Sequence, residues 1–263
     1  MKPCDAHLHL HFPELEKIDL EVYLESVSSV VVNGTSPQDW QAVAKLAREH
    51  PEQIIPQFGV HPWEVSKLTK NWQEELCDLL EQFPTAGVGE IGLDKWVKGF
   101  DLPLQKEIFQ AQIQIVNKYR RPATIHCLKA WGTLREILHK TPCEQPFLLH
   151  AYGGPADWLP EFYELGAYFS FSPYYLHSRK SERVDAFRLV PQDRLLIETD
   201  SPSMLGPQST WSKEQQAFSE DLQHPLNLIP IYKQAAHALG LTLEKLLEVS
   251  ASNFQKIFII SVG

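Results

Sequence analysis

The chain has 263 residues, of which 43% are apolar and 22% charged, and its formal net charge is −9 at pH 7. This length exceeds that of an ordinary domain but is usual for one α/β barrel. The acidic balance excludes a general nucleic-acid coat protein, which would carry a basic excess. No apolar run reaches the length of a membrane span, and the first residues lack the apolar core of a secretion signal, so we expect no membrane partner.

The four cysteines are Cys4, Cys77, Cys127 and Cys143, and no two of them form a CxxC pair. A chain this long and this rich in apolar residues does not need disulfides to hold its core. We therefore expect four reduced thiols in a cytoplasmic protein. Nothing in the sequence indicates an obligate protein partner.

Short apolar runs alternate with helical patterns along the chain, beginning with a run that ends at His9. Residues 29–33 are β-branched and continuous, as a buried parallel strand should be. Ser36 then suits a helix N-cap and Pro37 the first helical position, so we expect a helix to begin there. A third strand is predicted over residues 54–60, and the next helix over residues 70–83.

The fourth predicted strand, residues 87–94, contains three glycines. Glycine weakens a strand, so its use here fits a place where a ligand or another strand approaches the backbone. A long helix is predicted over residues 103–119. The remaining predicted strands cover residues 123–127, 147–150, 167–171 and 194–200.

The C-terminal part is predicted to be helical. Gly240 ends one helix and Thr242 caps another, and a short last turn is expected over residues 253–258. Residues 204–218 show no clear period and follow the last predicted strand, so we expect them to cover the site. No linker or low-complexity segment divides the chain, and we predict a single domain over residues 1–263.

Alternating strands and helices imply a parallel sheet. Eight such units in about 250 residues predict a single TIM-type (β/α)8 barrel. The competing architecture is an open, doubly wound sheet. No GxGxxG motif follows the first strand, which weakens the dinucleotide-binding form of that alternative.

Metal-capable side chains fall at the predicted strand ends, where the active site of such a barrel lies. His7 and His9 are two residues apart in a strand, so their imidazoles project to the same face. Each candidate also has a purely structural explanation, as a satisfied core histidine or a buried ion pair. Their joint placement at one mouth favours a metal site. The candidate ligands are His7, His9, Glu90, His126, His150 and Asp200.

Several motifs in this order make the chain resemble the TatD family of metal-dependent hydrolases, within the wider amidohydrolase-like barrels. The resemblance covers almost the whole chain. The motifs are Asp5-Ala6-His7-Leu8-His9-Leu10, Gly59-Val60-His61-Pro62, Gly89-Glu90-Ile91-Gly92-Leu93-Asp94, Ile125-His126-Cys127, His150-Ala151-Tyr152-Gly153-Gly154, Leu196-Ile197-Glu198-Thr199-Asp200-Ser201-Pro202 and the closing Ala251-Ser252-Asn253-Phe254-Gln255-Lys256-Ile257-Phe258.

The resemblance implies two divalent metal ions, each of which is zinc, manganese, magnesium or iron. His7 and His9 would bind the first ion, His126 and His150 the second, and Glu90 would bridge the two. Asp200 would bind or lie beside the first ion, orient the attacking water and take its proton. Glu90 serves better as a bridge than as a base, since two cations would depress its pKa strongly.

Other residues near the predicted mouth stay ambiguous. His61 follows the third strand and either contacts substrate or is a turn histidine held by Pro62. Trp63, Trp96 and Trp131 either stack on a base or pack over the rim of the barrel. Leu128 stands where many family members carry an arginine, which removes one possible phosphate contact.

We therefore expect a hydrolase that uses metal-activated water to cleave phosphodiester bonds, most directly those of DNA, as the resemblance implies. One alternative keeps the metal site but hydrolyses an ester or amide bond, as in a deacylase acting on misacylated tRNA. Another is a non-catalytic scaffold on a retained barrel. The intact set of six ligands argues against the scaffold.

Overall fold

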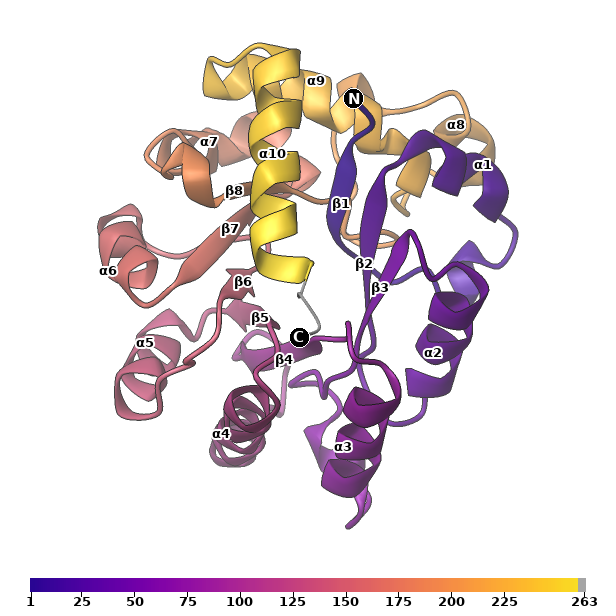
Figure 1. Ribbon diagram of the computed structural model, residues 1–263. Coiled ribbons are helices and arrows are strands. Elements are labelled where there is room, and N and C mark those ends of the chain that lie inside the picture. The colour runs from indigo at the N-terminus through magenta and orange to yellow at the C-terminus, as the bar shows by residue number, and fades with distance from the viewer. Residues whose placement is uncertain (260–263) are drawn as a thin grey trace.

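The computed structural model describes residues 1–259, in which eight parallel strands form a ring with helices around its outside (Figure 1). Residues 260–263, the end of the predicted domain, lie outside the described part. The predicted TIM-type α/β architecture is confirmed. The strands are β1 (Cys4–Leu8), β2 (Ser29–Asn33), β3 (Ile54–Gln57), β4 (Val88–Asp94), β5 (Ala123–Leu128), β6 (Phe147–Leu149), β7 (Ala167–Phe171) and β8 (Leu195–Ile197).

Regular strand pairing runs in the order β1-β2-β3 and, separately, β4-β5-β6-β7-β8. Backbone hydrogen bonds span both gaps in this ladder. Between β3 and β4, the Phe58 N–H donates to the Gly87 carbonyl at 3.2 Å. Between the chain after β8 and β1, the Asp200 N–H donates to the His7 carbonyl at 2.9 Å. The first and last strands are thus brought side by side, and the predicted ligands on both meet at one end of the ring.

Each strand is followed by at least one helix, and the helices that follow β1 to β7 lie on the outside of the ring (Figure 1). None of the helices in residues 1–259 is long and apolar enough to cross a membrane. The helices are α1 (Leu20–Ser26), α2 (Trp40–Glu49), α3 (Trp72–Gln82), α4 (Leu102–Tyr119), α5 (Trp131–Lys140), α6 (Leu159–Glu164), α7 (Ser181–Phe187), α8 (Gln215–Phe218), α9 (Leu228–Leu239) and α10 (Leu243–Phe258).

Helix α10 lies across one end of the ring (Figure 1). Its Phe254, Ile257 and Phe258 pack with inward-facing residues of the strands, such as Ala6 and Leu196. The Asn253 amide donates to the Leu195 carbonyl at the start of β8, at 2.9 Å. This helix therefore closes the end where the strands begin and leaves the end where they finish for a site.

Three predicted boundaries are wrong by three residues. Strand β3 ends at Gln57 and β8 at Ile197, because beyond these residues the chain bonds across the two gaps in the ladder. Helix α2 begins at Trp40, since the Asp39 carboxylate accepts the Thr35 N–H at 2.9 Å and holds residues 36–39 in a turn. The expected turn over residues 253–258 is the last part of α10.

The segment over residues 204–218 contains two short helical turns, one of them α8. The hydrogen bonds of this segment join its own residues or connect it to neighbouring loops. The Trp211 indole N–H donates to the Gly206 carbonyl at 3.0 Å, and the Ser212 N–H donates to the Asn227 amide oxygen at 2.7 Å. That it covers the site stays a prediction.

Candidate metal centre

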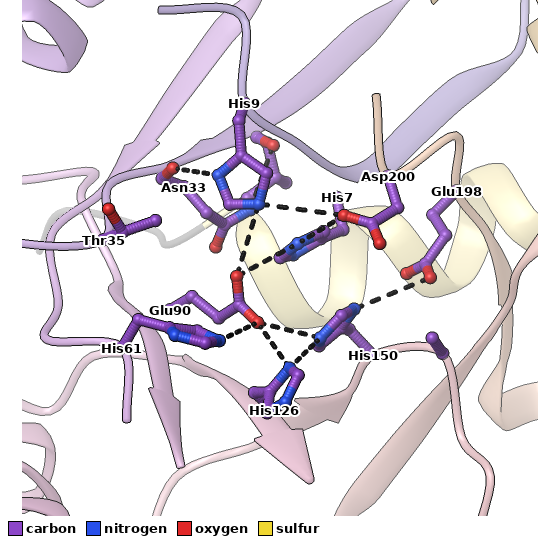
Figure 2. A network of polar contacts seen from close by, with 12 residues as sticks. His7, His9, Asn33, Thr35, His61, Glu90, His126, His150, Glu198 and Asp200 are labelled. Carbon is purple, nitrogen blue, oxygen red and sulfur yellow. Dashed lines mark hydrogen bonds and ion pairs between the residues drawn. The ribbon is translucent and has the colours of Figure 1, made fainter. Parts of the chain in front are cut away.

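The fold brings all six predicted ligands together at the end of the ring where the strands finish (Figure 2). His7 lies within β1, Glu90 within β4 and His126 within β5. His150 directly follows β6, and Asp200 follows β8 by three residues. All six lie within a buried or nearly buried cluster, so their polar atoms must find partners in one another or in a bound group.

Glu90 lies at the centre of the cluster, and its two carboxylate oxygens face different histidines (Figure 2). Oε1 lies 2.9 Å from His126 Nδ1 and 2.9 Å from His150 Nε2. Oε2 lies 3.5 Å from His7 Nε2 and 3.3 Å from His9 Nε2. A carboxylate with this arrangement is positioned to bridge two neighbouring cations.

Asp200 lies on the side of the first pair of histidines. Its Oδ1 is 3.3 Å from His7 Nε2 and 3.7 Å from His9 Nε2. In each of three sets of residues, the candidate ligand atoms all lie within 4.8 Å of one another, which is close enough for one ion to bind the whole set. The sets are His7, His9 and Glu90; His7, His150 and Asp200; and His61, Glu90 and His126.

Hydrogen bonds outside the cluster fix the tautomers of two histidines. His9 Nδ1 lies 2.8 Å from the Asn33 carbonyl oxygen, an acceptor, so Nδ1 carries the proton and Nε2 keeps its lone pair. His126 Nε2 lies 3.1 Å from Asp94 Oδ2, which leaves Nδ1 as the free ligand atom. Both free nitrogens point toward Glu90, as metal ligation requires.

His7 provides the strongest test of whether a cation fits. Its side chain is fully buried. Carboxylate oxygens of Asp200 and Glu90 lie 3.3 and 3.5 Å from Nε2, but neither ring nitrogen makes a hydrogen bond of good geometry within residues 1–259. An unpaired buried polar atom is costly. A cation at Nε2 would supply the missing partner, and imidazole with carboxylate is a donor set that zinc, manganese and iron accept.

The charges of the cluster favour a cation too. Burial lowers the pKa of His7, but the neighbouring Glu90 and Asp200 carboxylates outweigh it and raise that pKa to about 9. Burial raises the pKa of Glu90, yet the surrounding histidines hold it well below its usual range. The carboxylates thus attract positive charge, which protons supply when no metal is bound.

His61 reaches the cluster but has a different hydrogen-bond role. Its Nδ1 accepts the Trp63 N–H at 3.2 Å, so the neutral ring carries its proton on Nε2, which lies 3.6 Å from Glu90 Oε1. Burial lowers its pKa to about 3, which keeps the ring neutral. Although close enough to be a ligand, His61 therefore presents an N–H donor to the site.

Two residues that orient candidate ligands, Asp94 and Asn33, were not predicted. The alternation of β4 places Asp94 on the face of Glu90, four residues away, and this signal could have identified it. Asn33 acts through its main-chain carbonyl, for which the sequence holds no signal. Of the ambiguous tryptophans, Trp131 packs inside against Tyr152, with ring centroids 4.7 Å apart, while Trp63 and Trp96 are exposed.

An α/β barrel that gathers histidines and carboxylates where its strands end belongs to the class of metal-dependent hydrolase barrels. The family model described as TatD related DNase matches residues 4–259. The chain belongs to this family, as its motifs predict.

Relatives from distant organisms match over most of their length. The chain is 27% identical to the 3'-5' ssDNA/RNA exonuclease TatD of Edwardsiella piscicida, over 88% of each chain. It is 26% identical to the human deoxyribonuclease TATDN3, covering 97% of this chain and 93% of that protein. In structure it is similar to the TatD homologue YjjV of Escherichia coli, with a TM-score of 0.87 at 22% identity over 98% of both chains.

Proposed function

We propose that this protein is a divalent-metal-dependent nuclease that hydrolyses phosphodiester bonds of DNA. The observation that carries this proposal is the placement of Glu90, whose two oxygens face two separate pairs of histidines. The family and the nuclease names of its relatives support the substrate class. We also propose that residues 1–263 form one domain; its cytoplasmic location stays a prediction.

In this proposal His7, His9 and Asp200 hold one ion, His126 and His150 hold the second, and Glu90 bridges them. Two divalent ions bound there would make water acidic enough to attack near neutral pH and offset charge on the phosphoryl group. Zinc, manganese and iron suit the histidines, and magnesium suits a site of more oxygen ligands.

Asp200 is the general base in this proposal. Burial raises its pKa, but His7 and the other nearby histidines outweigh burial and lower it below its usual range. Asp200 is therefore ionised at neutral pH and can accept a proton from water. His61, with its proton on Nε2, is placed to donate a hydrogen bond to a phosphoryl oxygen as charge develops there.

The test measures cleavage of a short single-stranded DNA after EDTA treatment and reconstitution with each metal in turn. Asp200→Asn keeps the size of the side chain but removes the base, and we expect kcat to fall by about 10²- to 10⁴-fold. Asp185→Asn, at an exposed carboxylate on α7, is the control and should leave kcat unchanged. Failure of the wild-type protein to cleave DNA, or full activity of Asp200→Asn, would overturn the proposal.

Metal content gives a readout independent of turnover. Replacing His7 and His9 together by Ala should remove one ion per chain while far-ultraviolet circular dichroism stays that of the wild type. Mass spectrometry of the native protein counts the ions. An unchanged stoichiometry would refute this assignment of ligands. A panel of acyl esters, run beside the DNA, distinguishes phosphodiester hydrolysis from the ester or amide alternative.

A further inference from the structure

The exposed Trp and Phe side chains lie in loops at the end of the ring that carries the candidate metal centre. Within residues 1–259 only Trp63, Trp96 and Phe100 are aromatic and exposed, at 49%, 59% and 39%. All three lie in the loops that follow β3 and β4. Large exposed aromatic side chains that share one mouth of a barrel indicate a surface for a ligand.

One carboxylate connects these loops to the metal centre. Asp94 Oδ2 accepts the Trp63 indole N–H at 2.8 Å and Oδ1 accepts the Trp96 backbone N–H at 2.6 Å. The same Oδ2 lies 3.1 Å from the ring of the candidate ligand His126. The Trp63 ring also contacts His61, with centroids 4.9 Å apart. The aromatic surface therefore begins one residue away from the groups that would face the scissile phosphate.

Positive charge accompanies the aromatic side chains, although the whole chain is acidic. Lys95 and Lys98 are exposed in the loop after β4, and Lys129 is exposed just after β5. The Lys95 N–H donates to the Leu128 carbonyl at 2.9 Å, which brings these two loops together. Within the described residues no carboxylate lies within 4 Å of any of the three amines. These lysines are therefore free to meet phosphates.

We propose that Trp63, Trp96, Phe100, Lys95, Lys98 and Lys129, here called the rim, form a subsite for a single-stranded nucleic acid, in which a nucleobase beside the scissile phosphate stacks on Trp96. This inference rests on the proposed nuclease function and specifies how its substrate is held. Every nucleobase offers a π-face for stacking, and lysines match the flanking phosphates. In a duplex the bases are already stacked, so the rim favours single strands.

The test compares Trp96→Ala with the wild type on a single-stranded oligonucleotide and on the same strand with abasic sites around the cleavage point. The described hydrogen bond of Trp96 uses only its backbone N–H, so alanine leaves the loop anchored. Losing one stacked base should raise KM about 5- to 100-fold with little change in kcat. On the abasic strand the variant and the wild type should have equal KM.

Two further variants complete the design. Trp96→Phe keeps an aromatic ring and should restore most of the affinity for the normal strand. Leu189→Ala removes a similarly exposed apolar side chain in the chain after α7 and should leave KM unchanged. An unchanged KM in Trp96→Ala, or an equal loss on the normal and abasic strands, would overturn the rim subsite.

A binding measurement separates this inference from the proposed function. Fluorescence anisotropy of a labelled oligothymidylate reports affinity without turnover. If the wild type cleaves neither strand but Trp96→Ala binds the probe more weakly, the nuclease proposal fails and the subsite stands. If Trp96→Ala binds equally well but changes the oligomeric state in gel filtration, the surface is a contact between copies of the chain, and the subsite is refuted.

Discussion

Asp94 connects the candidate metal centre to the surface around it. Its carboxylate contacts His126 Nε2, the Trp63 indole and the Trp96 backbone N–H, and its own N–H donates to Gln105 at 2.9 Å. A carboxylate behind a ligating histidine fixes the ring and makes the free nitrogen a better ligand. Burial raises the pKa of Asp94, but the bond from His126 and the N–H donors lower it, so the carboxylate is ionised at neutral pH.

Replacing Asp94 by Asn tests this role. The amide has one acceptor oxygen and a donor nitrogen, so it cannot receive all three N–H groups. We expect the affinity for the ion near His126 to fall about 10- to 100-fold while the other ion stays bound. Metal titration followed by calorimetry measures both sites. Asp101→Asn is a suitable control, because asparagine also accepts the Leu104 N–H that caps α4. Equal affinities in both variants would contradict the prediction.

The sequence identifies site residues whose ionisable side chains are unusual at strand ends, but it gives no signal for residues that act through a main-chain group. His7, Glu90 and Asp200 stand out because ionisable side chains rarely occupy strand ends without a partner. The Asn33 carbonyl is no different in sequence from any other carbonyl, and only the pairing of β1 with β2 brings it to His9. The tautomer of His61 depends on the turn at Trp63 in the same way.

The close approach of β4 to β5 determines where His126 lies. Gly92 pairs with His126 in the parallel ladder and has a φ of 143°, a conformation that side chains disfavour. A Cβ there would lie 1.9 Å from the His126 carbonyl oxygen. The glycines of the fourth strand were predicted to permit a close approach of backbones, and Gly92 does so at the strand that carries a candidate ligand.

Gly92→Ala should therefore destabilise the fold by at least about 2 kcal/mol, from backbone strain together with the overlap. Urea unfolding followed by circular dichroism measures the free energy of unfolding. Gly132→Ala is the matched control, because Gly132 is helical in α5 and its added Cβ would meet no atom closer than 3.9 Å. The control should be unchanged or more stable by up to about 1 kcal/mol. Similar losses in both variants would show that the contact at β5 is unimportant.

The order of strands and helices was predictable, because the spacing of apolar residues along the sequence distinguishes the two. Where several of these elements begin or end was not predictable. Helix α2 begins at Trp40 because Asp39 bonds back to Thr35, although Ser36 and Pro37 form an acceptable start signal. Two nearby polar residues compete to define that start, and tertiary contacts decide between them. The ends of β3 and β8 depend likewise on bonds to strands distant in sequence.

A buried carboxylate joins the beginning of the ring to its end. Asp5 in β1 accepts the Thr199 N–H at 2.9 Å and the Thr199 hydroxyl at 2.7 Å, across 194 residues of sequence. The Tyr23 hydroxyl donates to the same carboxylate at 3.0 Å. Because His7 and Asp200 are neighbours of these two residues, the contact that joins the strands also aligns the candidate metal ligands.

Thr199→Val keeps the shape of the side chain but removes the hydroxyl, so a buried carboxylate oxygen of Asp5 loses one of its two donors. The cost of such a loss is about 1–3 kcal/mol, and urea unfolding should report it as a lower midpoint with an unchanged slope. Thr199→Ser retains the hydroxyl and should recover most of the stability. Thr69→Val, at an exposed position, should change stability by less than about 0.5 kcal/mol. If Thr199→Val is as stable as Thr69→Val, the side-chain bond does not hold the ring together, and the backbone hydrogen bond from the Asp200 N–H to the His7 carbonyl must suffice.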